Sequence, residues 1–222
     1  MSIARGGWSW ILGSLGIPAA VAAVCGFAGA TGWVWVFVAV ALVAGGFMLF
    51  FFRDPDRRAP GEGHLLIAGA DGVVRTVEDM PESSYLKCDT VRISVFLSPF
   101  DVHVNRSPLA GKVAALAYTP GKHFLTMRDE SSEYNEHSSI YIEGSGTRCL
   151  VKQIVGPVVR RVVYWLEDGQ EVAKGERIGI MKFGSRMDIY FPRSDVEVLV
   201  KQGDRVRAGE TPIASLKEAL ST

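Results

Sequence analysis

The sequence lacks a net charge, because 24 lysine and arginine residues balance 24 aspartate and glutamate residues over 222 positions. A balanced chain has no overall field that attracts a polyanion, so we expect no nucleic-acid partner. Cysteine is also scarce. Cys25, Cys88 and Cys149 show neither a paired spacing nor a metal-ligand grouping. They are therefore interpreted as reduced structural or incidental thiols, and no metal centre is expected.

Charged residues are absent from positions 8–52, where long apolar runs dominate. Residues 33–52 are apolar throughout, and a helix of this length rises about 30 Å, the thickness of one hydrocarbon core. Residues 8–30 are a second candidate helix, and Thr31-Gly32 is the expected turn between them. The prediction is a membrane hairpin over residues 1–52, either spanning the bilayer or deeply inserted. A cleaved signal peptide fits less well, because the apolar stretch is too long and no clear small-residue cleavage site follows.

Both flanks of this hairpin are basic. Arg5 precedes it, and Arg53, Arg57 and Arg58 follow it. Under the positive-inside rule both ends then lie on the cytoplasmic side. We expect the cell (inner) membrane as the location, with the remaining domain on the cytoplasmic face.

The rest of the chain lacks a convincing long helix before its last few residues. Residues 53–63 are charged and rich in turn formers, so they are interpreted as a linker. From residue 64 to residue 222, short β-like runs alternate with Gly, Pro and Asp, which predicts a mostly-β barrel or sandwich. The predicted strands are residues 65–68, 72–77, 91–97, 112–118, 139–142, 149–154 and 158–165.

One internal repeat is visible. Asp-Gly-Gln-Glu-Val-Ala-Lys-Gly-Glu at residues 168–176 recurs as Gln-Gly-Asp-Arg-Val-Arg-Ala-Gly-Glu at residues 202–210. Each unit supplies a glycine turn, one valine expected to be buried, and a second glycine turn that leads into a strand. Two such units predict a pseudo-symmetric barrel-sandwich like that of lipoyl and biotinyl carrier modules. The prediction concerns the fold alone, because proteins that share a fold can differ in function.

Three short motifs carry possible chemistry. They are Ala-Gly-Ala-Asp-Gly-Val-Val at residues 68–74, Phe-Leu-Ser-Pro-Phe-Asp-Val-His-Val-Asn-Arg-Ser-Pro at residues 96–108, and Phe-Gly-Ser-Arg-Met-Asp at residues 183–188. In the third motif the Ser185 hydroxyl can attack the carbonyl of Gly184, where no side chain obstructs it and where glycine freely adopts unusual dihedrals. Singly, each motif has an ordinary explanation: Asp71-Gly72 as a turn, His103 as a strand residue and Ser185 as a bend.

In combination and order, the three motifs resemble those of phosphatidylserine decarboxylase in its short, membrane-associated prokaryotic form. The likeness covers residues 60–215 and includes the segments at residues 120–124 and 135–137. It implies a proenzyme that cuts itself between Gly184 and Ser185 into a large (β) chain, residues 1–184, and a small (α) chain, residues 185–222. The two chains would form a heterodimer, either alone or as the unit of a higher homo-oligomer.

The resemblance also implies the chemistry. Ser185 would become a pyruvoyl group, which forms a Schiff base with the serine headgroup and takes the place of pyridoxal phosphate, with no metal. Phosphatidylserine, drawn from the lipid bilayer, would lose CO2 to give phosphatidylethanolamine in phospholipid biosynthesis.

The resemblance further suggests roles for individual residues. His103 would carry protons, oriented by Asp71 in the manner of a triad acid. Many longer members have a second histidine where this chain has Arg106, which leaves the base for self-cleavage open. Arg106 is expected either to bind the substrate phosphate through its planar fork or to be a plain surface charge. His123 is a further substrate-binding candidate.

Three other functions compete with this interpretation. A biotinyl or lipoyl carrier modified at Lys182 would explain the Ile-Met-Lys-Phe sequence at residues 180–183 and the repeat. A pyruvoyl decarboxylase of a soluble amino acid would explain the motifs but not the hairpin. A non-catalytic, membrane-tethered β-domain would leave the polypeptide uncut.

Overall fold

The computed structural model describes residues 2–124, 126, 134–156, 162–182 and 184–217 of the chain. It divides into two compact units, Met1–Asp56 and Arg57–Thr222. The boundary between them falls within the charged segment 53–63. Each unit is described by itself.

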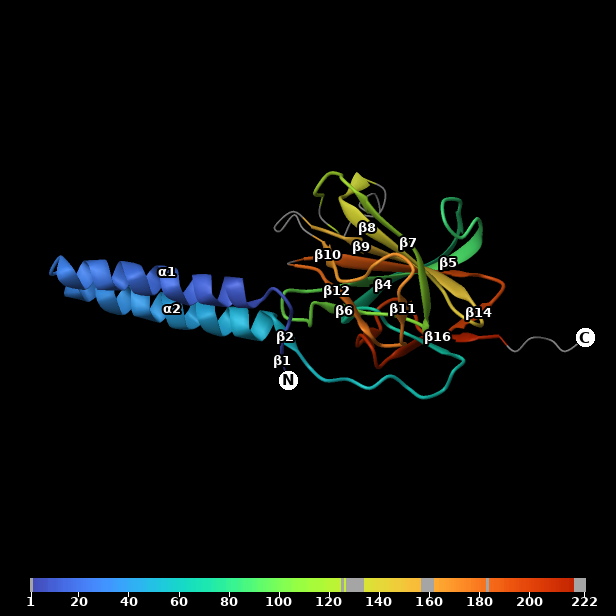
Figure 1. Ribbon diagram of the computed structural model, residues 1–222, viewed down its shortest axis with the longest axis horizontal. Coiled ribbons are helices and arrows are strands. Elements are labelled where there is room, and N and C mark those ends of the chain that lie inside the picture. Colours follow the sequence, from blue (N-terminus) through green and yellow to red (C-terminus); the bar gives the residue numbers. More distant parts are fainter. Residues whose placement is uncertain (1, 125, 127–133, 157–161, 183, 218–222) are drawn as a thin grey trace, which may run out of the picture. The chain divides into compact units, whose positions relative to one another are not determined.

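The first unit is a pair of apolar helices, α1 (Trp8–Phe27) and α2 (Thr31–Phe51), which lie side by side (Figure 1). A short ladder joins β1 (Ser2–Ile3) to β2 (Arg53–Asp54) at the open end of the pair. The helices approach closely at Gly45, where a Cβ atom would come within 2.3 Å of the Leu15 side chain. The predicted helical hairpin is confirmed.

The predicted turn at Thr31-Gly32 is wrong, because α1 ends earlier than expected and these residues begin α2. The chain leaves α1 at Gly29, whose φ of +76° lies in the left-handed region that glycine adopts without penalty. The amide of Ala28 still donates to the Val24 carbonyl, which closes the last turn of the helix.

The hairpin presents apolar side chains outward. Only 11% of the most apolar window of each helix is buried, unlike a core helix of a soluble domain, and both helices are long and apolar enough to cross a membrane. Exposed tryptophans mark both ends, Trp8 and Trp10 at the start of α1 and Trp33 and Trp35 at the start of α2. Tryptophan favours the membrane–water interface, so these features indicate membrane association.

The second unit is built from short strands. They are β3 (Leu65–Ile67), β4 (Gly72–Glu82), β5 (Cys88–Phe96), β6 (Val104–Arg106), β7 (Gly111–Thr119), β8 (His137–Glu143), β9 (Arg148–Ile154), β10 (Val163–Tyr164), β11 (Glu171–Val172), β12 (Arg177–Ile180), β13 (Arg186–Pro192), β14 (Val196–Val198), β15 (Arg205–Val206) and β16 (Pro212–Leu216). The first six predicted strands are confirmed. The seventh predicted strand, residues 158–165, is described only in part, because residues 158–161 lie outside the described residues. Within residues 162–165, β10 covers only Val163–Tyr164.

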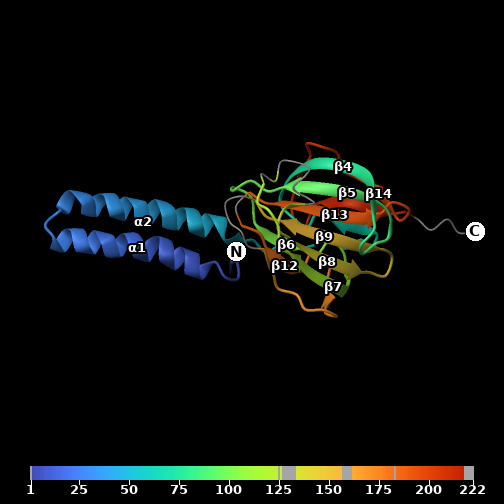
Figure 2. The same ribbon diagram turned by 90° about the horizontal axis from the view of Figure 1, so that it is seen from above.

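The main sheet has eight antiparallel strands in the order β11-β7-β8-β9-β13-β5-β4-β15, and it curls around an apolar core (Figure 2). Strand β13 lies near its centre, paired with β5 from Arg186 to Pro192 and with β9 from Arg186 to Tyr190. Every residue of β13 is buried. Two three-stranded sheets, β10-β12-β6 and β14-β16-β3, complete the unit.

The repeat forms the two edges of the main sheet. In the first copy Val172 of β11 pairs with Gly111, and in the second Val206 of β15 pairs with Gly72; both valines are buried. The four repeat glycines, Gly169, Gly175, Gly203 and Gly209, have φ values between +80° and +95°. The predicted turn–valine–turn pattern and the pseudo-symmetric, mostly-β fold class are confirmed.

Candidate active site

Gly184 and Ser185 lie between β12 and β13, at the interruption that the sequence predicted; Phe183 lies outside the described residues. Gly184 has a φ of +70°, and a Cβ atom built on it would meet nothing within 4 Å. Glycine is therefore required here for its backbone conformation, since the space around it is open.

Ser185 is fully buried. Its Oγ donates to the carbonyl oxygen of Lys182 over 3.3 Å. Its own carbonyl oxygen accepts a hydrogen bond of 2.9 Å from the amide of Leu97. Leu97 belongs to the motif that carries His103, so the fold brings the second and third motifs together.

The first motif joins them through Gly72. The backbone at Gly72 has a φ of +149°, and a Cβ atom there would come within 2.0 Å of the Phe96 carbonyl oxygen. Only glycine allows this approach, which explains the Asp-Gly pair. All three motifs therefore converge around the start of β13, although they are far apart in the sequence.

Thr126 contacts the carbonyl of Gly184 directly. Its Oγ1 donates to the Gly184 oxygen over 2.9 Å, and the residue is buried. A Cβ atom built on Gly156 would lie 2.2 Å from the same Gly184 oxygen, so the backbone of Gly156 also packs against this oxygen. Sequence reasoning missed Thr126, because its segment has no motif beyond its place in the overall resemblance.

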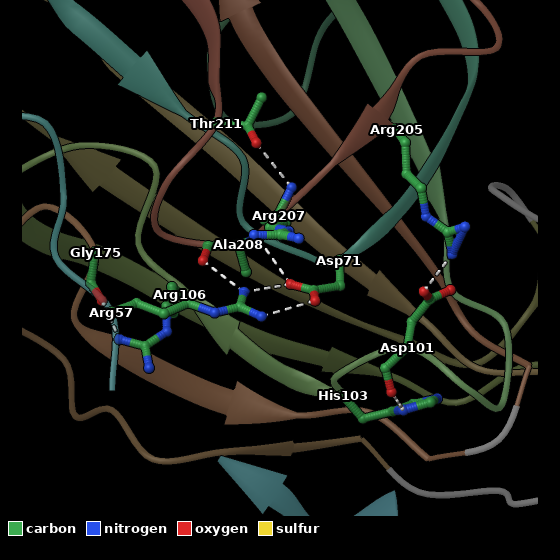
Figure 3. Close-up of polar contacts among 10 residues, drawn as sticks. All are labelled: Arg57, Asp71, Asp101, His103, Arg106, Gly175, Arg205, Arg207, Ala208 and Thr211. Atoms are coloured by element: carbon green, nitrogen blue, oxygen red, sulfur yellow. Dashed lines mark hydrogen bonds and ion pairs between the residues drawn. The ribbon is translucent and has the colours of Figure 1, made fainter. Parts of the chain in front are cut away.

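His103 is fully buried, and its Nδ1 lies 2.9 Å from the backbone carbonyl oxygen of Asp101 (Figure 3). A carbonyl only accepts, so Nδ1 carries the proton and Nε2 of the neutral ring is the basic nitrogen. The amide of Met181, just after β12, donates to the carbonyl of His103 over 3.2 Å. His103 therefore lies beside the segment that leads to Gly184.

Asp101 holds the turn before His103. Its carboxylate accepts hydrogen bonds of 2.8 Å from the Ser98 amide and from Arg205. Burial acts to raise the pKa of this carboxyl, but these hydrogen bonds outweigh it and hold the pKa below its usual range. The sequence offered one signal for Asp101, its position two residues before the histidine.

Asp71 contacts a different partner from the one expected. The guanidinium of Arg57 binds both of its carboxylate oxygens, one of them at 2.8 Å, and the Ala208 amide donates to it over 2.8 Å (Figure 3). Among the described residues, the contacts of Asp71 are to Arg57 and Ala208 and none is to His103. In the uncut chain Arg57 therefore holds Asp71, and Arg57 also donates to the Ala208 carbonyl over 2.8 Å.

Arg106 is buried, so its interpretation as a plain surface charge is wrong. Its Nη1 donates to the Gly175 carbonyl over 3.0 Å, and a Cβ atom at Gly209 would come within 2.6 Å of its Cδ (Figure 3). The side chain therefore packs between the second glycine turns of the two repeat copies, which bury it.

His123 lies in a segment tied to Asn135. Its Nε2 is 3.0 Å from a carboxylate oxygen of Glu136, and its side chain is 23% exposed, so the ring is partly accessible to solvent. The side-chain oxygen of Asn135 accepts from the Phe124 amide, and its nitrogen donates to the carbonyls of Phe124 and Val155.

Comparison with known proteins identifies the family. The family model described as "Phosphatidylserine decarboxylase" matches residues 44–214, which include Asp71, His103 and the Gly184-Ser185 step. The chain belongs to the phosphatidylserine decarboxylase family.

Relatives within the phosphatidylserine decarboxylase family match nearly the whole chain. A "Phosphatidylserine decarboxylase proenzyme" of Carboxydothermus hydrogenoformans is 40% identical over 94% of this chain and 94% of its own length. A relative of the same name from Symbiobacterium thermophilum is 38% identical over 97% of this chain and 96% of its own length. One from Desulfotalea psychrophila is 40% identical over 80% of this chain and 83% of its own length. These relatives are named as decarboxylases that are made as proenzymes.

Within the described part of the chain, no group of three or more His, Cys, Asp or Glu side chains is arranged to hold a metal ion. Among the described residues, the Thr126 hydroxyl donates to the Gly184 carbonyl and the Leu97 amide donates to the Ser185 carbonyl. The Arg186 guanidinium lies one step away, on the carbonyl of Thr126.

Proposed function

We propose that the chain is the proenzyme of a membrane-bound, pyruvoyl-dependent phosphatidylserine decarboxylase that cuts itself between Gly184 and Ser185. The mature enzyme would convert phosphatidylserine to phosphatidylethanolamine and CO2 in phospholipid biosynthesis. The observation that carries the proposal is the Gly184-Ser185 step itself. It has a left-handed glycine, a buried serine and a hydroxyl donor on the carbonyl to be attacked.

The first step is an N-to-O acyl shift. Ser185 Oγ adds to the Gly184 carbonyl carbon and gives up its proton, and the carbonyl oxygen takes the negative charge. His103 is our proposed proton acceptor, because its Nε2 is basic while Asp101 fixes Nδ1. The C–N bond then breaks, which leaves Gly184 as an ester on the serine oxygen and a free amine on residue 185.

Elimination completes the cut. Loss of the Cα proton of residue 185 expels the Gly184 carboxylate with the former serine oxygen, and it leaves a Cα=Cβ double bond. Water then displaces ammonia and leaves a ketone at the N-terminus of the small chain. Oxidation and reduction balance internally, so no outside oxidant or reductant is required.

The residues around Ser185 fit a pyruvoyl group. The carbonyl of residue 185 survives the conversion, and the Leu97 amide already donates to it. When formed, the ketone supplies the electron sink that a decarboxylation needs. Asp71 is proposed to orient His103 in the mature enzyme. This role requires the Asp71 carboxylate to give up its contact with Arg57 and to accept a hydrogen bond from the His103 imidazole. Arg106 and His123 are proposed to face the headgroup phosphate.

The two products are expected to stay together as a heterodimer. The small chain, residues 185–222, supplies β13 at the centre of the main sheet, β15 at its edge, and β14 and β16 of a second sheet. Removing it would expose the apolar faces of all these strands to water.

The hairpin is proposed to hold this enzyme at the cytoplasmic face of the cell membrane, where its lipid substrate lies. The basic residues on both flanks, with Arg5 before the hairpin and Arg58 after it, support this orientation.

Gel and mass analysis of the wild type and of Ser185→Ala tests the proposal. The wild type is expected as two pieces, the smaller one without a free terminal amine, and it should release CO2 from phosphatidylserine vesicles but not from free serine or aspartate. Ser185→Ala should remain one inactive chain. Two results would contradict the proposal. One is a Ser185→Ala protein that is still split after Gly184, and the other is an uncut wild-type chain with an adduct on Lys182.

The role of His103 is tested in the same assay. His103→Ala is expected to slow cutting, turnover or both by roughly 10²-fold or more. If this variant matures and turns over like the wild type, His103 has no part in the chemistry.

A further inference from the structure

We propose that Thr126 is a catalytic residue of self-cleavage, the hydrogen-bond donor to the oxyanion that forms on Gly184. This inference rests on the proposed self-cleavage between Gly184 and Ser185. Its starting point is the 2.9 Å contact from Thr126 Oγ1 to the Gly184 carbonyl oxygen. The carbonyl can only accept, so the threonine hydroxyl is the donor.

The strength of this hydrogen bond depends on the charge of the oxygen. In the resting peptide the acceptor is neutral. When Ser185 Oγ adds to the carbonyl carbon, the oxygen becomes negative, and hydrogen bonds to ionised acceptors are roughly twice as strong as neutral ones. A donor already in place therefore stabilises the transition state more than the ground state, which lowers the barrier.

Burial increases the effect. Thr126 is 3% exposed, and the backbone of Gly156 packs against the same carbonyl oxygen. The oxygen therefore has protein atoms on two sides, and the hydroxyl that donates to it belongs to a buried residue. A hydrogen bond from a buried donor contributes more than the same bond would in water.

A buried ion pair contacts the backbone of Thr126. Arg186, the residue after the serine, binds both carboxylate oxygens of Asp188 at 2.7 and 2.9 Å. Its Nη1 also lies 3.5 Å from the backbone carbonyl of Thr126. Because Arg186 and Asp188 belong to β13, the strand that begins directly after the nucleophile also contacts the residue that supplies the donor.

The test follows conversion of the full-length precursor into two chains, with Thr126→Val and Thr126→Ser compared with the wild type. Valine keeps the shape and removes the hydroxyl, and serine keeps the hydroxyl. We expect Thr126→Val to cut roughly 10²- to 10³-fold more slowly. Thr126→Ser should stay within about tenfold of the wild type, a loss of no more than ~1.4 kcal/mol of barrier lowering.

Hydroxylamine shows where the slow variant stops, because it cleaves esters. The uncut Thr126→Val chain should resist hydroxylamine, since the ester has not formed. Three results would overturn the role of Thr126: wild-type cutting by Thr126→Val, an equal loss in Thr126→Ser, or an ester that accumulates in Thr126→Val. Cutting of Ser185→Ala would instead refute self-cleavage itself, so the two failures are distinguishable.

Discussion

Asp188 is a buried carboxylate three residues after the candidate cleavage serine. It is fully buried, it binds Arg186, and Arg92 lies 3.8 Å away. Burial alone would raise the pKa of this carboxyl, but the hydrogen bonds and charge of Arg186, with the charge of Arg92, hold the pKa below its ordinary value. The carboxylate is therefore ionised at neutral pH. Removing its charge would take a buried counter-ion from Arg186 and one of two carboxylate partners from Arg92, which also pairs with Glu78.

We predict that Asp188→Asn, made in the uncut Ser185→Ala background, lowers the free energy of unfolding at pH 7 by about 3–5 kcal/mol. A depressed carboxyl pKa contributes stability that is present above the unfolded-state pKa of about 3.9 and is lost as pH falls through the folded-state value. The difference between the two proteins should therefore narrow below about pH 4. Urea unfolding at a series of pH values measures it, and a difference that stays constant down to pH 2 would contradict the ion-pair account.

At the scale of elements, β13 is central to the proposed cut and to its consequence. The strand begins directly after Ser185, and its registers with β5 and β9 hold the serine in place. The same pairing would hold the small chain after the proposed cut. Such a cut would change the connectivity of the sheet but not its strand pairing, so the precursor would unfold as one chain and the mature enzyme as two.

We predict that the urea midpoint of the mature enzyme rises with protein concentration, because unfolding releases two chains. Each tenfold increase should add about 1.4 kcal/mol to the apparent stability. The uncut Ser185→Ala chain is the control, and its midpoint should not move. Equal behaviour of the two proteins would mean either that the chains do not separate or that the precursor itself is an oligomer, and sedimentation of Ser185→Ala decides between these.

At the scale of the whole molecule, the chain joins two units of opposite solvent preference. The hairpin exposes large apolar side chains such as Phe27 (95% exposed) and Trp35 (75%), while the β unit buries its apolar residues in a core. Tryptophans at both ends of the helix pair favour an arrangement that crosses the bilayer, since each end then meets an interface.

We predict that Thr31→Cys, at the first residue of α2 and next to the turn between the two helices, reacts with a membrane-impermeant maleimide in intact cells. The background carries Cys25→Ala and Cys88→Ala, since both of these free thiols are partly exposed, and Ser2→Cys at the other end is the matched control. Ser2→Cys should react only after the membrane is permeabilised. Protection of Thr31→Cys in intact cells would contradict a spanning hairpin with both ends in the cytoplasm.

The sequence by itself determined the features that depend on neighbouring residues. Charge-free, mostly apolar composition specified the two helices, glycine spacing specified the repeat turns, and the Gly184-Ser185 step specified the candidate cleavage site. These patterns act over a few residues, so periodicity and composition reveal them. The helix turn was misplaced, since several glycines in that region compete and Gly29 is the one with left-handed backbone.

Only the tertiary structure decided which side chains surround the cleavage site. Thr126 reaches Gly184, Arg57 reaches Asp71, and Arg106 reaches Gly175 across long stretches of chain. Such contacts depend on strand order and register in a curled sheet, which bring distant backbone segments within hydrogen-bond range. No local pattern encodes them, because the same threonine or arginine elsewhere on the sheet would face a different neighbour.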